Sequence, residues 1–525
     1  MSLVRATATI GGLTLVSRIL GFVRDMLFAR FVGAGLASDC FLIAFRLPNL
    51  FRALFAEGAF SAAFVPMFSR TLGAADGRIA AGQAFAEDVL AVLLPVLVAF
   101  TAAMIVLAWP VVWLLTGGFP GASPEKFGLA VAFTKITFPY LLTISLVSLL
   151  GGILNSIGRF WVNAAAPVLL NVALITALVA FHGHGDRYSA LMQSAAVSVA
   201  GILQLLWLLW ACHRAGIDLR LRVPQLSPQV RQLLRLIGPA AIGTGAFQIN
   251  QLISTALAAR FLGEGAVSYL YYADRLNQLP LGLVGIGVGT ALLPTLARQL
   301  GAGNDAVALH TQNRAVELVL LLTLPAAAAL VISAAPIVAT LLEHGRFTHL
   351  DTLRTAAVLA AFSIGLPAYV LVKVMTPGFH ARQDTRTPVR IALVAMAVNL
   401  AGNLLLIVPL GYVGIALSTA VSAWLNAALL YATLRRRGQF GIDARLRRSG
   451  PRLLLATMVM AGVLFAANRL VDPYMAASLI ARAAALAALL GAGAATYLGI
   501  AMVTRAFVFA DIKAQLTRRP RRPST

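Results

Sequence analysis

Apolar stretches of about 20 residues or more recur along nearly the whole chain, with short polar segments between them. A helix needs about 20 residues to cross the roughly 30 Å hydrocarbon core of a bilayer, so this pattern predicts spanning helices. We place fourteen spans at about 8–33, 36–69, 88–115, 127–154, 161–181, 189–212, 233–262, 268–298, 314–342, 355–378, 388–409, 412–434, 453–470 and 477–507. The chain is therefore expected to be an all-α polytopic integral membrane protein.

An internal repeat divides these spans into two sets. The segment ARFVGAGLAS at 29–38 returns as ARFLGEGAVS at 259–268, and AAFVPMFSR at 62–70 returns as TALLPTLAR at 290–298. The repeat predicts an N-lobe of helices 1–6 at 1–222, a C-lobe of helices 7–12 at 223–448, and helices 13–14 with a basic tail at 449–525. Because six is even, the two lobes are parallel repeats, which place a substrate site near the midplane between them.

Composition and charge support a membrane protein. The chain is 59% hydrophobic and 12% charged, which excludes an ordinary soluble protein. The net charge of +23 would suggest nucleic acid in a soluble chain, but here arginines collect in alternate connections, as at 435–448, without interleaved aromatic residues. The positive-inside rule then places both termini in the cytoplasm, and no nucleic-acid partner is expected.

Charged residues inside the first two spans are the main functional signal. An Arg or Asp at the centre of a spanning helix costs roughly 2.5–3.5 kcal/mol, so such residues are not expected to face lipid together. At about 100° per residue, Ser17, Arg18, Arg24 and Asp25 form one polar stripe on the first span. The second span carries Asp39, Arg46, Arg52 and Glu57, with a kink expected at Pro48.

These charges allow two interpretations. They could be mutually neutralising ion pairs that only hold helices together, or they could line a site for an anionic ligand. Guanidinium groups suit bidentate phosphate binding, and the arginines outnumber the acids near them in the first span, which favours an anion-binding cavity at membrane depth. In the eighth span Tyr271, Asp274, Arg275 and Gln278 form a stripe expected to face the same cavity. A local Asp274–Arg275 pair is the alternative there, although adjacent helical residues point about 100° apart.

Other kinds of site have less support. The oxygens of Asn399, Asn403 and Thr419 could coordinate a monovalent cation, but the cluster lacks a carboxylate and interhelical hydrogen bonding explains it as well. Cys40 and Cys212 are expected near opposite membrane faces, which excludes a disulfide between them and a cysteine metal site. No nucleotide-binding loop or nucleophile motif occurs, so we predict a transporter without catalytic residues, bound metal or organic cofactor.

Four segments resemble the MurJ (MviN) family of lipid II flippases, of the multidrug/oligosaccharidyl-lipid/polysaccharide exporter superfamily. They are SRILGFVRD at 17–25, FRLPNLFRALFAEGAFSAAFVPMF at 45–68, YYADRLNQLPLGLVGIGVGTALLP at 271–294 and FHARQDTRTPV at 379–389. The resemblance implies movement of the undecaprenyl-pyrophosphate-linked peptidoglycan precursor to the outer leaflet of the bacterial cytoplasmic membrane, in cell wall biogenesis. It also implies a groove for the lipid tail at the last two helices.

The resemblance also implies roles for individual residues. Substrate binding falls on Ser17, Arg18, Arg24, Arg52 and Arg275, and the important acids include Asp39 and Glu57. A cation site would lie near Asn399, Asn403 and Thr419. We expect alternating access in which Asp25, Asp39 and Glu57 pair with the arginines when the cavity is empty, with Asp274 as a further ion-pair or gating residue. A monovalent cation or the membrane potential is the expected coupling source.

Three alternatives follow from the same residues. A cation-coupled exporter of small molecules should have a more acidic or aromatic cavity. A flippase for another polyprenyl-linked oligosaccharide would need the same arginines, and only the segment at 45–68 favours lipid II over it. A structural protein that anchors cell-wall synthesis proteins would tolerate replacement of the cavity arginines.

Overall fold

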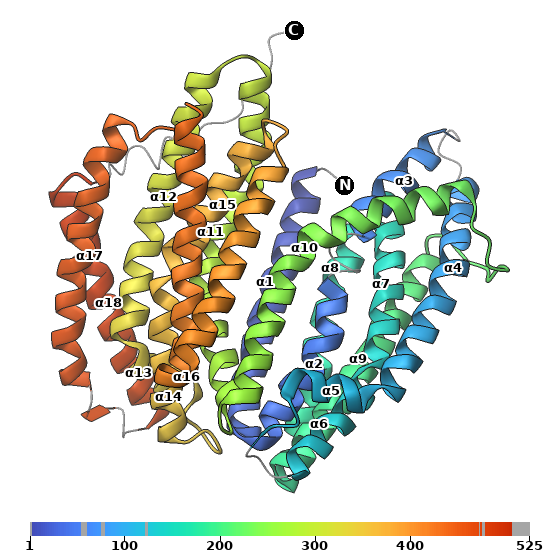
Figure 1. The fold of residues 1–525 in the computed structure, drawn as a ribbon, viewed down its shortest axis with the longest axis horizontal. Helices are drawn as coiled ribbons and strands as arrows, with labels where there is room; N and C mark the ends of the chain where they lie inside the picture. The colour runs from blue at the N-terminus through green and yellow to red at the C-terminus, as the bar shows by residue number, and fades with distance from the viewer. Residues whose placement is uncertain are drawn as a thin grey trace. The chain divides into compact units, whose positions relative to one another are not determined.

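The structure is a computed structural model that describes residues 3–53, 60–74, 79–120, 124–471, 473–474 and 478–506. Every regular element in these residues is helical, as predicted (Figure 1). The helices are α1 Leu3–Val32, α2 Leu36–Phe51, α3 Phe60–Ala74, α4 Ile79–Val106, α5 Ala108–Thr116, α6 Pro124–Thr137, α7 Pro139–Ser156, α8 Phe160–Phe181, η2 His182–His184, α9 Asp186–His213, α10 Pro228–Phe261, α11 Ala266–Gly301, α12 Asp305–Ile332, α13 Ala334–Leu342, α14 His349–Ile364, α15 Leu366–His380, α16 Arg386–Arg436, α17 Ala444–Val471 and α18 Leu479–Val503.

Each predicted span coincides with one helix or with consecutive helices. The span predicted at 127–154 is α6 followed by α7, which begins at Pro139 because proline lacks the donor that would continue the ladder. The spans predicted at 388–409 and 412–434 are the two limbs of α16, which kinks at Gly411 with φ 56° and ψ −132°. Among the described residues nine helical segments are long and apolar enough to cross a membrane, so the count of fourteen spans stays a prediction.

The chain divides into two compact units. The first comprises Met1–Tyr271 with Leu342–Asp351, and the second comprises Tyr272–Leu341 with Thr352–Thr525. Helix α10 belongs to the first unit, where it packs on α2, α3, α4 and α5. The lobes predicted at 1–222 and 223–448 are defined by sequence repetition rather than by packing, and they stay a prediction.

Aromatic residues form part of the core of the first unit, where α3, α4 and α7 meet. Phe64 stacks on Phe60 and on Phe85, with ring centroids 5.2 and 5.6 Å apart. Gly152 of α7 lies against this stack, and a Cβ there would come within 3.0 Å of Phe64. A glycine is therefore needed for this helix to approach so closely.

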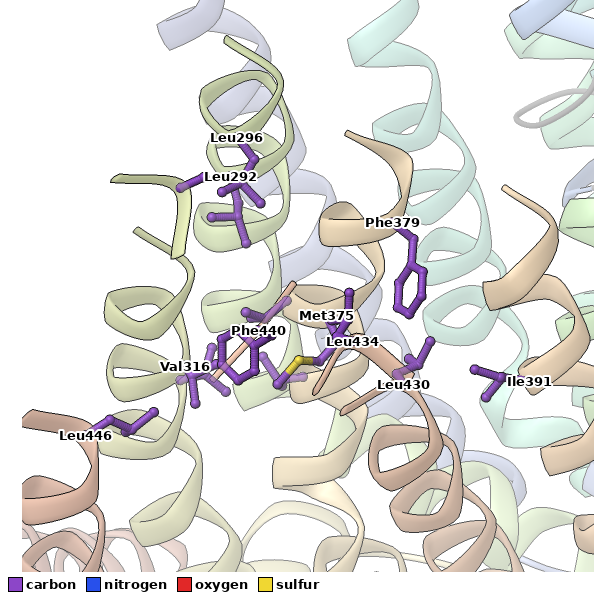
Figure 2. Close-up of a cluster of buried hydrophobic side chains, with 14 residues drawn as sticks. Leu292, Leu296, Val316, Met375, Phe379, Ile391, Leu430, Leu434, Phe440 and Leu446 are labelled. Carbon is purple, nitrogen blue, oxygen red and sulfur yellow. The ribbon is translucent and has the colours of Figure 1, made fainter. Parts of the chain in front are cut away.

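The second unit has its own apolar core, built from α11, α12, α15, α16 and α17 (Figure 2). Met375 and Phe379 of α15 lie among residues from the other helices. Phe440, inside the connection from α16 to α17, and Leu446, in the first turn of α17, belong to the same cluster. Buried side chains thus hold the connection and the start of α17 against the core.

Candidate functional site

Helix α1 carries Arg24 into the interior of the first unit, where only 9% of the residue is exposed. Its Nη1 donates to Oδ1 of Asn171 on α8 over 3.1 Å, and its Nη2 donates to the hydroxyl of Tyr271 on α11 over 3.3 Å. Buried charges persist when they are paired and hydrogen-bonded, and this guanidinium is held by three helices. The polar stripe predicted for the first span therefore faces protein at Arg24.

Asp25 neutralises Arg24 directly. Its Oδ1 accepts from Nε of Arg24 at 3.1 Å, from Nη2 at 2.7 Å, and from the Tyr271 hydroxyl at 2.9 Å. The sequence argument that adjacent helical residues pair poorly is wrong for this pair, because the long arginine side chain folds back toward its neighbour. One carboxylate oxygen thus occupies the guanidinium edge that an anionic ligand would need.

A small, narrow pocket borders this network. Its lining combines the Arg24–Asp25 pair with aromatic, aliphatic and amide side chains from α1, α2, α8, α9 and α11. The residues are Arg24, Asp25, Phe28, Phe41, Leu42, Phe45, Leu174, Gln193 and Tyr271. A pocket with one paired cation and mainly apolar walls can accept an anionic group that displaces the carboxylate.

Ser17 and Arg18 precede this network by two turns of α1. Asn171 Nδ2 donates to the Ser17 carbonyl over 2.9 Å and lies 3.4 Å from its Oγ, so Asn171 joins Ser17 to Arg24. Arg18 is exposed, and within the described part of the chain no ion pair involves it. The structure thus brings Ser17 and Arg24 together and leaves Arg18 accessible.

The other predicted ligands lie elsewhere. Arg52 follows α2 on a π-helical turn, a feature frequent at functional sites, and its Nε donates to Oδ1 of Asn49 over 2.8 Å. Glu57 lies outside the described residues. Asp274 and Arg275 belong to the second unit, where Oδ2 of Asp274 accepts from Gln278 over 2.6 Å and Arg275 is partly buried.

Asp39 forms a second polar centre in the first unit and is only 1% exposed. It accepts from the Gly265 and Ser268 amides at 2.8 and 3.0 Å and from the Ser268 hydroxyl at 2.7 Å. Its ionic partner is Lys126 of α6 at 3.0 Å, rather than one of the arginines expected from the sequence. Lys126, which falls between the spans predicted at 88–115 and 127–154, is buried in a helix, and its Nζ lies 4.8 Å from the ring centre of Phe119.

The amides proposed for a cation hydrogen-bond one another. Asn399 Nδ2 donates to Thr419 Oγ1 across the two limbs of α16, and Asn403 Nδ2 donates to Asn399 Oδ1, both over 3.2 Å. Thr419 in turn donates to the Ile415 carbonyl over 2.9 Å. The interhelical interpretation accounts for these contacts, while cation binding stays a prediction.

Sequence reasoning missed two residues of these centres, Asn171 and Gln193. Asn171 is a buried amide in a spanning helix, which implies a polar partner on a neighbouring helix. Gln193 lines the pocket from α9, where its surroundings are apolar and small. A search for every amide inside an apolar span would have found both.

Comparisons with known proteins agree with this architecture. The family model described as "Lipid II flippase MurJ" matches residues 28–485. A curated protein of Rhizobium meliloti (strain 1021), "Probable lipid II flippase MurJ", is 46% identical over 508 residues, covering 95% of this chain and 94% of that protein. A solved structure of "Lipid II flippase MurJ, inward closed conformation" is 24% identical with a TM-score of 0.78, covering 96% and 99% of the two chains.

The likeness in fold extends to a wider group. An inward-facing multidrug resistance MATE family transporter of the MOP superfamily is 17% identical with a TM-score of 0.68, covering 80% of this chain and 94% of the other. The exporter-superfamily fold expected from the sequence is thereby confirmed. Since the family model spans most of the chain, this protein belongs to the MurJ family of lipid II flippases.

Proposed function

We propose that this chain carries lipid II, the undecaprenyl-pyrophosphate-linked peptidoglycan precursor, from the cytoplasmic to the outer leaflet of the bacterial cytoplasmic membrane. The observation that supports this proposal most directly is the buried Arg24, held by Asn171 and Tyr271 beside a small pocket. A pyrophosphate is the anionic part of lipid II that such a guanidinium can bind in a bidentate manner. The activity is transport, with no covalent change in the lipid.

Binding proceeds by exchange of anions at Arg24. In the empty protein Asp25 neutralises the guanidinium, so the buried cation has a partner before substrate arrives. A phosphate oxygen then replaces Oδ1 of Asp25, while Asn171 and Tyr271 keep the guanidinium in place. Arg18, Arg52, Arg275 and Ser17 hold the remainder of the headgroup, and Glu57 and Asp274 act with Asp25 as ion-pair residues.

Transport follows by alternating access, with both termini in the cytoplasm. Moving one charge through 100 mV is worth about 2.3 kcal/mol, so the membrane potential or a monovalent cation can drive return of the carrier. A cation would use Asn399, Asn403 and Thr419. Membrane lipids surround the protein, and cell-wall synthesis proteins are proposed partners on the cytoplasmic side.

The test uses bacteria depleted of their own flippase and supplied with this chain or a variant. Lipid II that has reached the outer leaflet is measured by cleavage with an externally added lipid-II-degrading protein. Arg24→Ala should abolish cleavage, whereas Arg187→Ala, which removes an exposed arginine paired with Glu125, should leave it unchanged. Equal cleavage with Arg24→Ala and wild type, at equal protein levels, would refute the arginine site.

A further inference from the structure

The connection from α9 to α10, residues 216–227 and here called the first strap, is tied to α4 by its charged groups. Glu87 of α4 is 3% exposed, and its carboxylate accepts from the Arg220 amide over 3.1 Å and pairs with Arg222 at 2.7 Å. Gln83, one turn earlier, donates to the Asp218 carbonyl over 2.6 Å. The strap therefore directs polar groups inward, toward the helix.

The second unit contains a related clamp, in which the repeated segment continues into the first turn of α17. The sequence GIDLRLR at 216–222 returns as GIDARLR at 441–447, here called the second strap. Its receptors on α12 are Asn313 and Glu317, spaced as Gln83 and Glu87 are. Asn313 donates to the Gly441 carbonyl over 2.9 Å, and Glu317 pairs with Arg445 at 3.2 Å.

The two straps differ in what they expose. At corresponding positions, Leu221 of the first strap is 71% exposed whereas Leu446 of the second is buried in the core of Figure 2. Val223, which is 78% exposed, corresponds to Arg448. Leu221 and Val223 thus form an exposed apolar edge of the first strap, whereas the second strap exposes Ile442 (51%), whose counterpart Ile217 is buried.

The surroundings of the first strap favour lipid as the occupant of that edge. It joins two helices predicted to span the membrane, which places it at the membrane surface, and in Figure 1 it lies beyond α4 at the margin of the first unit. Exposed Trp210 lies shortly before the first strap at the end of α9, and exposed Trp161 at the start of α8 contacts it through Trp207, as in an interfacial aromatic belt. Exposed cations flank the edge: Arg214, Arg220, Arg231 and Arg235.

We propose that the first strap is an interfacial anchor whose Leu221 and Val223 enter the headgroup region of the adjacent leaflet, with anionic phospholipid as the partner. The Glu87 clamp holds the Arg220 amide and the Arg222 side chain against α4 and leaves Leu221 and Val223 exposed. The flanking arginines attract anionic headgroups, as basic segments beside spanning helices do. This role concerns the bilayer and does not depend on the transported substrate.

Lipid contact is measured by fluorescence quenching in nanodiscs. Leu221→Cys or Val223→Cys is labelled with an environment-sensitive dye, and Cys40 and Cys212 are buried and remain unlabelled. The quencher is a phospholipid with a nitroxide near its carbonyl group. The control is Ala302→Cys, exposed in the turn from α11 to α12, which the positive-inside rule assigns to the same membrane face.

The strap positions should be quenched at least about twice as strongly as the control in discs containing phosphatidylglycerol. Replacing phosphatidylglycerol with phosphatidylcholine should reduce quenching at the strap positions. In the double variant Arg231→Gln with Arg235→Gln, quenching should differ less between the two lipids. Quenching equal to that of the control would overturn the proposal. Weak quenching in discs together with cross-linking of position 221 to another protein in cells would overturn it in favour of a protein partner.

Discussion

Ser38 and Ser268 hold the same place in the two copies of the repeated decapeptide, and their hydroxyl oxygens lie 2.7 Å apart. The Ser268 hydroxyl also donates to Asp39, and the Ser38 hydroxyl also donates to the Gly35 carbonyl. The repeat that reveals the internal duplication therefore also forms a contact inside the first unit. The contact is centred on a buried carboxylate, and its ionic partner Lys126 comes from outside the repeated segments.

Asp39→Asn is expected to destabilise the protein by leaving Lys126 buried without an anion. Breaking a buried pair from one side costs about 3–5 kcal/mol, whereas replacing both partners costs much less. The double variant Asp39→Asn with Lys126→Met should therefore recover part of the loss in apparent melting temperature of the detergent-solubilised protein. A double variant no more stable than Asp39→Asn would show that the ion pair is not the cause.

Asn171 is expected to position Arg24 for its ligand. Hydrogen bonds to charged groups contribute about 1.5–3 kcal/mol, so Asn171→Leu should lower flipping roughly 10-fold or more. Asn171→Asp should be still less active, because a second carboxylate would compete with the pyrophosphate for the guanidinium. The measurement is outer-leaflet lipid II in depleted cells, and full activity of Asn171→Asp at normal protein levels would contradict the anion-exchange mechanism.

Much of the fold follows from the sequence because the hydrophobic period and the bilayer thickness together specify long helices. The sequence also predicted Ser17, Arg24, Asp25 and Tyr271 as parts of polar stripes, and the structure brings these four together. What could not be predicted is the choice of partner. A lone Lys126 between apolar segments looks like a connection residue, and nothing local indicates that Asp39 is its counterion.

The two clamps were missed for a related reason. Glu87 and Glu317 lie in the first halves of α4 and α12, and their burial depends on straps more than 120 residues away in the chain. The repeated GID segments are short, and their copies are 225 residues apart rather than the 230 of the decapeptide. Only the packed structure shows that the acids and the straps belong together.

Asp384 joins the two ends of α16 and should make stability depend on pH. Hydrogen bonds from Arg437 and Thr387 hold the pKa of this carboxyl well below its usual range. A depressed folded-state pKa gives stability that is present above the unfolded value of about 4 and is lost as pH falls below it. Because Arg437 is 41% exposed, solvent screening limits the contribution to about 0.5–1 kcal/mol.

Melting of wild type and Asp384→Asn from pH 7 down to pH 3 tests this dependence. Wild type should melt at a higher temperature at pH 7, and the difference should shrink below about pH 4, as this carboxyl in the unfolded state takes up a proton that the folded state does not yet bind. The Arg437→Gln variant should melt at pH 7 close to the temperature of Asp384→Asn, since it removes the largest cause of the lowered Asp384 pKa. A difference that persists unchanged at pH 3 would show that Asp384 acts through shape rather than charge.

Limited trypsin digestion should distinguish the two clamps. Glu87→Gln removes the anion that holds Arg222, so cleavage after Arg220 and Arg222 should speed up, because a protease needs a locally released backbone. Glu317→Gln should accelerate cleavage after Arg445 much less, since buried Phe440 and Leu446 and the first turn of α17 also hold this segment. Glu125→Gln breaks an exposed ion pair and is the control, with digestion expected to match wild type.

Two outcomes would contradict this prediction. Equal acceleration in the Glu87 and Glu317 variants would mean that the buried apolar side chains contribute nothing to holding the second strap. Unchanged digestion in both variants would mean that backbone contacts, and not the carboxylates, fasten the straps.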